Sequence, residues 1–142
     1  MSGQRKIPMG RAYTIAAALW LMTVGGGAWA QGLANPASQN CAARGGTLRI
    51  EQRPDGGQFG VCVFTDNYQC EEWAMFRGEC PVGGLRVTGY ITPAARFCAI
   101  TGGRYAVTAR SGASDEQGVC ALPGGKACDA AAYYSGACSR QR

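Results

Sequence analysis

The sequence predicts an α+β protein built from two tandem, disulfide-stapled units, each running helix, strand, strand, helix, and packed together as one body. Gaps of 21, 8 and 10 residues separate the first four cysteines, and gaps of 22, 8 and 10 separate the last four. The pairs Gly45–Gly46 and Gly102–Gly103 fall at matching places, as do Pro36 and Pro93. A repeat of about 57 residues with this many matches calls for two similar structural units.

The first 30 residues have the order of charges and apolar residues of an export signal. Arg5, Lys6 and Arg11 form a positive region, 12–24 is almost wholly apolar, and 28–30 has small residues at both ends. The apolar run is shorter than the roughly 20 residues of a membrane-spanning helix. We expect cleavage after Ala30, which places the mature protein in the periplasm or outside the cell.

The mature part, 31–142, has the length of one ordinary domain. Removing the signal leaves eleven basic residues against nine acidic ones, so the net charge falls from +5 to +2. A surface for nucleic acid carries a much stronger positive charge. We therefore expect no nucleic-acid partner. We also expect no integral membrane segment in the mature chain, because no stretch after the signal is long and apolar enough to span a membrane.

All eight cysteines lie in the mature part, and an even number in a small exported protein indicates disulfides. They are Cys41, Cys62, Cys70, Cys80, Cys98, Cys120, Cys128 and Cys138. Zinc sites need closely spaced cysteine pairs, usually with histidine, and the chain has no histidine. The sequence therefore predicts no metal and no other cofactor.

We favour the pairing of Cys41 with Cys62, which ties the first helix to the strands and leaves Cys70 for Cys80. A straight helix over those ten steps spans about 15 Å, whereas bridged α-carbons lie within about 7 Å. This pairing therefore requires a helix of under two turns before Gly78. A longer helix favours Cys62 with Cys70 and Cys41 with Cys80.

The elements follow from local signals. Asn35 and Thr92 are N-caps followed by proline, and the glycine pairs end the two helices, the first over 36–44. Residues 47–51 alternate as a half-buried strand, and the turn at 55–57 leads to a second strand over 59–64. In the second unit the strands lie around 105–107 and 119–122.

The domain boundaries follow the repeat: a signal over 1–30, a first repeat over 31–80, a connector over 81–91 and a second repeat over 92–142. Val87, Gly89 and Ile91 suggest a strand in the connector, which is too short and apolar for a free linker. Each repeat has about 45 residues and buries little apolar surface, so the disulfides supply part of its stability.

The stretch from Cys70 to Cys80 carries the candidate binding residues. The second copy keeps its cysteines and glycine but replaces Glu71, Glu72, Trp73 and Arg77 by Asp129, Ala130, Ala131 and Ser135. We expect Glu71 and Glu72 to be solvated charges in the first helical turn. Trp73 and Arg77 share a helix face, which suits stacking of the guanidinium on the indole. We predict that the binding face consists of Tyr68, Glu71, Glu72, Trp73 and Arg77. The second copy is expected mainly to complete the body.

No catalytic constellation is present in the sequence. Adjacent Glu71 and Glu72 point about 100° apart on a helix and do not converge as acid and base. Serine and cysteine nucleophiles lack a histidine base, and no glycine pair has the spacing of a phosphate loop. We therefore expect a protein that is not an enzyme.

The motifs of the first repeat resemble a family of small exported bacterial proteins named as hemolysins. The resemblance rests on Asn35-Pro-Ala-Ser38, Cys41, Gly45–Gly46, Cys62 and Glu71-Glu-Trp-Ala74, and the second repeat resembles the family as a degenerate copy. The family is often lipid-anchored and its domain has no established function, whereas this chain has no lipid-bearing cysteine after its signal. A pore former needs an amphipathic helix or barrel strands that enter lipid, and no stretch of the mature chain is long enough.

Two functions fit these observations. The first is a rigid, non-enzymatic binding module of the cell envelope, whose partner is a protein or another envelope component. The alternative is a secreted inhibitor or hemolysin-like toxin that acts on a foreign enzyme or membrane, with 51–58 as the inhibitory loop.

Overall fold

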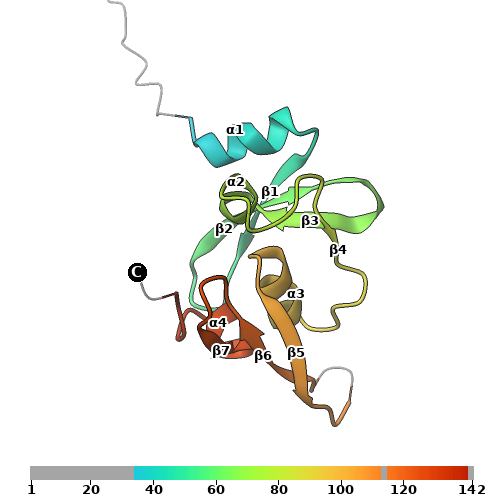
Figure 1. Ribbon diagram of the computed structural model, residues 1–142, viewed down its shortest axis with the longest axis vertical. Helices are drawn as coiled ribbons and strands as arrows, with labels where there is room; N and C mark the ends of the chain where they lie inside the picture. Colours follow the sequence, from blue (N-terminus) through green and yellow to red (C-terminus); the bar gives the residue numbers. More distant parts are fainter. Residues whose placement is uncertain (1–33, 113–114, 141–142) are drawn as a thin grey trace, which may run out of the picture. The chain divides into compact units, whose positions relative to one another are not determined.

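A computed structural model describes residues 34–112 and 115–140. The predicted signal at 1–30 lies outside the described residues. The first repeat comprises α1 (Pro36–Ala43), β1 (Thr47–Gln52), β2 (Gln58–Val63), the short 3₁₀ turn η1 (Thr65–Asn67), β3 (Tyr68–Glu71) and α2 (Glu72–Phe76). The connector contributes β4 (Leu85–Arg86), and the strands form an antiparallel sheet in the order β1-β2-β3-β4 (Figure 1).

The second repeat follows the same plan without a fourth strand. Its elements are α3 (Pro93–Ile100), β5 (Arg104–Ala109), β6 (Gln117–Ala121), β7 (Ala127–Asp129) and α4 (Ala130–Tyr134). The three strands form an antiparallel sheet in the order β5-β6-β7. The α+β class and the two tandem units are thus confirmed.

Each repeat has one strand more than the sequence predicted. Cys70 and Cys128, placed at the start of a helix, lie instead in the short strands β3 and β7, where each faces the cysteine of the preceding strand. The connector strand was also misplaced. It lies at Leu85–Arg86, where it pairs with β3, and not at the alternating residues Val87, Gly89 and Ile91. Of the alternating residues only Val87 is buried, while Ile91 is exposed, because backbone pairing with a neighbour, and not alternation alone, decides where a strand forms.

The four disulfides are Cys41–Cys62, Cys70–Cys80, Cys98–Cys120 and Cys128–Cys138, so every bridge stays within its repeat. Their Cα–Cα distances lie between 5.6 and 6.0 Å. The favoured pairing is confirmed, and its geometric condition is met because α2 and α4 have only five residues each. Gly78 and Gly136 then take positive φ angles of 76° and 81°, which turn the chain back towards the bridge.

The glycine pairs have two separate physical roles. Gly45 and Gly102 follow α1 and α3 with φ angles of 80° and 85°, the left-handed conformation that ends a helix. A Cβ on Gly46 would lie 2.2 Å from Sγ of Cys62, and one on Gly103 would lie 2.5 Å from Sγ of Cys120. The second glycine of each pair therefore leaves space for the disulfide.

The two repeats belong to one compact unit, and α3 supplies much of the contact between them. Arg96 donates to both carboxylate oxygens of Glu51 at 2.7 and 2.9 Å and also to Oε1 of Gln69. The ring of the next residue, Phe97, lies 5.0 Å from that of Phe59 in an edge-on arrangement. Packing as one body is thus confirmed at the level of side-chain contacts.

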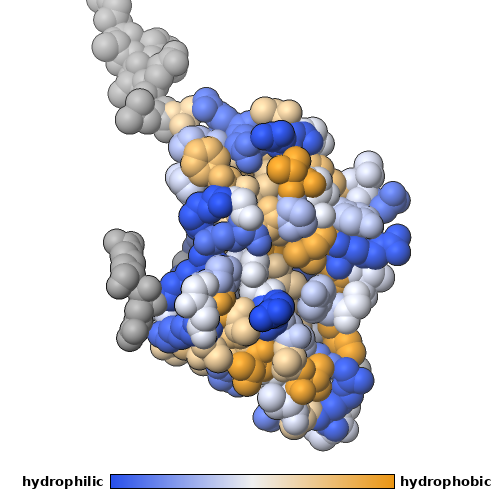
Figure 2. Space-filling model, in the orientation of Figure 1, coloured by the Kyte–Doolittle hydropathy of each residue, from blue (hydrophilic) through white to orange (hydrophobic). Residues whose placement is uncertain are grey.

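Apolar side chains complete the join between the repeats. Val61, Val87 and Ile100 form a buried cluster that draws on the first sheet, the connector and α3. On the face shown in Figure 2, hydrophobic residues are scattered in small patches among hydrophilic ones. The buried apolar clusters thus lie inside each repeat and between the two.

Candidate functional site

The predicted binding face divides in two in the structure. Glu71 and Glu72 are buried, with exposed fractions of 9% and 5%, whereas Trp73 is 39% exposed and Tyr68 and Arg77 are also exposed. The expectation that both glutamates are solvated helix charges is therefore wrong. A five-residue helix wedged between a strand and a disulfide has little free surface, so adjacent residues at its start point inwards.

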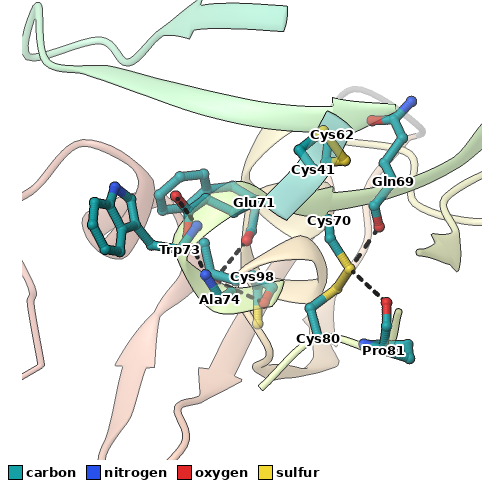
Figure 3. The surroundings of a disulfide bond; sticks show 12 residues. Cys41, Cys62, Gln69, Cys70, Glu71, Trp73, Ala74, Cys80, Pro81 and Cys98 are labelled. Atoms are coloured by element: carbon teal, nitrogen blue, oxygen red, sulfur yellow. Dashed lines mark hydrogen bonds between the residues drawn. A yellow bond between two sulfur atoms is a disulfide. The ribbon is translucent and has the colours of Figure 1, made fainter. Parts of the chain in front are cut away.

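Glu71 is the N-cap of α2. Its carboxylate accepts hydrogen bonds from the backbone N–H groups of Trp73 at 3.1 Å and Ala74 at 2.7 Å (Figure 3). Burial raises the pKa of Glu71, and these two hydrogen bonds oppose that increase. Asp129 caps α4 in the same way by accepting from the N–H of Ala132, so this carboxylate serves the fold in both repeats.

Glu72 joins the two helices of the first repeat. Its carboxylate accepts from Oγ of Ser38 at 2.5 Å and from Nδ2 of Asn35 at 3.1 Å. Asn35 also caps α1 by accepting from the N–H of Ala37. The Asn-Pro-Ala-Ser motif and the glutamate 34 residues beyond it therefore form one polar cluster, which is structural and not part of a solvent-facing site.

The second repeat lacks every member of this polar cluster. Thr92, Ala95 and Ala130 replace Asn35, Ser38 and Glu72, and both alanines are buried. Thr92 still caps its helix by accepting from the N–H of Ala95. The serine and the glutamate are thus lost together, as expected for two groups that satisfy each other.

Trp73 and Arg77 are available at the surface but do not stack on each other as predicted. The Trp73 ring packs edge-on against Phe76 with centroids 5.7 Å apart. The Arg77 guanidinium instead lies 2.9 Å from the Glu79 carboxylate. Arg86 lies over the ring of Tyr68, 5.8 Å from its centroid.

An open groove of about 370 Å³ runs between the repeats beside Trp73. The first repeat contributes Phe59, Glu71, Trp73 and Arg77, and the second contributes Phe97, Thr101, Tyr133, Ser139 and Arg140. Its walls are thus aromatic, with polar and charged groups among them. The volume lies in the range of small-molecule and side-chain pockets.

Glu79 organises the charges beside the groove. It accepts from Arg140 at 2.7 Å on both carboxylate oxygens and from Arg77 at 3.0 Å. Burial acts to raise the pKa of Glu79, but the hydrogen bonds from the two arginines outweigh it, and the pKa lies below its ordinary value. Arg140 also donates to the backbone carbonyl of Thr101 at 2.7 Å. The two guanidinium groups are therefore held in place at the groove.

Sequence reasoning missed the contribution of the second repeat, which was expected mainly to complete the body. Five of the nine residues that line the groove come from it. Tyr133 and Tyr134 stand where the first copy has Met75 and Phe76, and Phe97 packs against both tyrosine rings at 5.1 and 5.3 Å. This enrichment in aromatic residues was the available signal, but it did not show that the rings face the first repeat.

Comparison with protein-family models gives two matches to the family described as "Domain of unknown function (DUF333)", over residues 32–79 and 89–137. The chain belongs to this family. The two DUF333 matches coincide with the two structural repeats, so each repeat is one copy of the domain. No curated protein and no solved structure matches the chain. Within 34–112 and 115–140, no helix is both long and apolar enough to cross a membrane.

Proposed function

We propose that this protein is an exported, non-enzymatic binding module of the cell envelope, which holds part of a protein or another envelope component in the groove between its repeats. The observation that carries the proposal is the exposure of Trp73 and Arg77 on the rim of a groove with aromatic walls. Tryptophan and arginine dominate the energetics of binding surfaces. The disulfides support export, because they are typical of oxidising compartments.

The aromatic rings and the arginines favour a ligand with two chemical features. Trp73 and the half-buried Phe59 offer apolar surface to a ring or an aliphatic chain, whereas Phe97 and Tyr133 are only 6% and 9% exposed and back the groove from the core. Arg77, whose side chain is 45% exposed, offers N–H donors to a carboxylate or carbonyl group. The carboxylate of Glu71 is occupied by backbone N–H groups, so we assign it to positioning α2 and not to binding.

Trp73 provides a direct test because it is the only tryptophan in residues 31–142. Envelope components that co-purify with the exported protein are titrated against it while the fluorescence of Trp73 is followed. A saturable change in emission is expected. An unchanged spectrum for every component that co-purifies contradicts the proposed site.

Arg77→Ala is the informative variant. It removes a donor at the rim but only an exposed ion pair, which is worth about 0–1 kcal/mol, so the melting temperature should hardly move. Affinity should fall about tenfold. Arg86→Ala is the matched control, because this exposed arginine of the connector lies outside the groove. Equal affinities for the two variants argue against the groove.

The resemblance to proteins named as hemolysins supplies the competing hypothesis of a lytic or inhibitory activity. Lysis of red cells by the oxidised protein would favour it. The loop at 51–58 is held at its start, where Glu51 binds Arg96, and is braced internally by the Arg53–Asp55 ion pair at 2.9 Å. An inhibitory role for this loop is tested separately by substituting residues within 51–58. These substitutions should leave the emission of Trp73 unchanged, so the two hypotheses have different readouts.

A further inference from the structure

Among residues 34–112 and 115–140, no strand pairs with the outer edge of β1, so this edge of the first sheet is open. All six residues of β1 are exposed or half-buried. Proteins prevent edge strands from pairing by keeping them short or by inserting bulges. Here β4 has two residues, β7 has three, and β5 carries an irregularity between Val107 and Ala109. β1 has regular pairing over its full length and neither of these two forms of protection, although it carries the charged residues Arg49 and Glu51.

The pairing of β1 with β2 determines which backbone groups face the open edge. The N–H of Arg53 donates to the carbonyl of Gly57 at 2.8 Å and closes the hairpin. Hydrogen-bonded and non-hydrogen-bonded pairs alternate along an antiparallel ladder. Counting back from Arg53, the residues that bond to β2 are Glu51, Arg49 and Thr47. The backbone groups of Leu48, Ile50 and Gln52 therefore point to the open edge.

The next ladder gives the same result independently. The N–H of Phe64 donates to the carbonyl of Tyr68 at 2.9 Å. Alternation then directs the backbone of Cys62 towards β3 and that of Val61 towards β1. Val61 is the partner of Arg49, so Arg49 bonds inwards and its neighbours bond outwards.

The side chains of β1 are self-complementary about Ile50. Ile50 is 56% exposed and Leu48 is 37% exposed. Arg49 and Glu51 flank Ile50 with opposite charges on the other face of the strand. Glu51 binds Arg96 through one hydrogen bond on each oxygen, and a carboxylate has about four acceptor positions. Its carboxylate therefore has room for a second arginine.

We propose that β1 pairs with β1 of a second copy of this chain, antiparallel and with Ile50 opposite Ile50. In this register the outward-pointing residues face one another, as backbone bonding requires. Arg49 of each copy then lies opposite Glu51 of the other, in the non-hydrogen-bonded pairs whose side chains are closer. Centring the pair on Arg49 or on Glu51 instead places like charges opposite each other. Charge therefore disfavours both of these registers, and the register centred on Ile50 gives a two-fold symmetric dimer.

This dimer is independent of the proposed ligand site. None of the residues that line the inter-repeat groove belongs to β1. Loss of dimerisation therefore leaves the groove hypothesis untouched, and loss of ligand binding leaves the dimer untouched.

Sedimentation velocity of the oxidised, exported protein over a wide concentration range tests the proposal. We expect a reversible monomer–dimer equilibrium. Arg49→Glu turns two attractive cross-strand pairs into repulsive ones and should weaken dimerisation about tenfold. The matched control is Arg104→Glu, which makes the same charge change on β5 and should leave the equilibrium unchanged.

Ile50→Pro is the second variant. It removes an N–H group that points to the open edge and none of those that bond to β2, and proline is tolerated at such edge positions. It should abolish the dimer while circular dichroism and the four disulfides remain as in the parent. A protein that is monomeric at every concentration overturns the proposal. A dimer that survives both Arg49→Glu and Ile50→Pro also overturns it. So does an edge of β1 that binds an unrelated extended peptide in place of a second copy.

Discussion

The polar cluster of Asn35, Ser38 and Glu72 allows a sharp prediction about stability, because the second repeat shows what replaces it. Glu72→Ala removes the acceptor from two donors and leaves Ser38 without a partner. A hydrogen bond to a charged group contributes about 1.5–3 kcal/mol. Asn35 is exposed and recovers a bond to water. We therefore expect Glu72→Ala to lower the free energy of unfolding by about 2–4 kcal/mol. This is the cost of a buried, hydrogen-bonded carboxylate and not of the solvated helix charge that the sequence predicted for Glu72.

Ser38→Ala acts on the same bond from the other side. It leaves one oxygen of a buried carboxylate without its donor, which costs about 1–3 kcal/mol. The double variant Ser38→Ala, Glu72→Ala reproduces the arrangement of Ala95 and Ala130. Replacing both partners leaves no unsatisfied group, so its cost should be smaller than the sum of the two single costs by about 1–2 kcal/mol.

Gly60 supplies an internal check on this reasoning. A Cβ at this position would lie 2.5 Å from Cδ of Glu72. Gly60→Ala should therefore destabilise the parent protein, yet it should be tolerated where Glu72 is alanine, because the added methyl group enters the vacated space.

The assay is urea unfolding of the oxidised protein for the parent, both single variants and the double variant. The four free energies form a double-mutant cycle. Strict additivity, with no coupling between positions 38 and 72, refutes the assignment. Retention of the full cost of Gly60→Ala in the Glu72→Ala background also contradicts it.

Three further predictions follow from the charges, bridges and N-terminus. The pKa of Glu79 is lower in the folded protein than its ordinary 4.5, so its contribution to stability is complete above that pH and is lost as the pH falls through the folded value. Arg140→Gln should flatten this acid limb in unfolding measured against pH. Replacing Cys70 and Cys80 by serine should cost about 3 kcal/mol from the opened loop, measured by urea unfolding, whereas an unchanged midpoint argues against the bridge. Mass spectrometry of the exported protein should find Gln31 at its N-terminus, and a retained Met1 would exclude cleavage.

The amino-acid sequence was enough to predict the duplication, the α+β class, bridges within each repeat and most helix and strand positions. These features rest on local or repeated signals. Proline and a capping side chain start α1 and α3, a glycine with positive φ ends them, and matched cysteine spacing demands the same pairing twice. Such signals depend on residues within a few positions of one another, so they remain readable in a linear chain.

The directions of the side chains in α2 were decided only by tertiary structure. A helix of five residues has no periodicity that identifies its buried face, so the sequence did not show that Glu72 points towards Ser38. The groove depends in the same way on contacts across the repeats, such as Phe59 with Phe97. Contacts between distant residues depend on how whole elements pack, and packing sums many weak interactions that no short motif records. The edge of β1 has no neighbouring strand in the described part of the chain for the same reason, because the sheet order and not the strand's own sequence places β1 last.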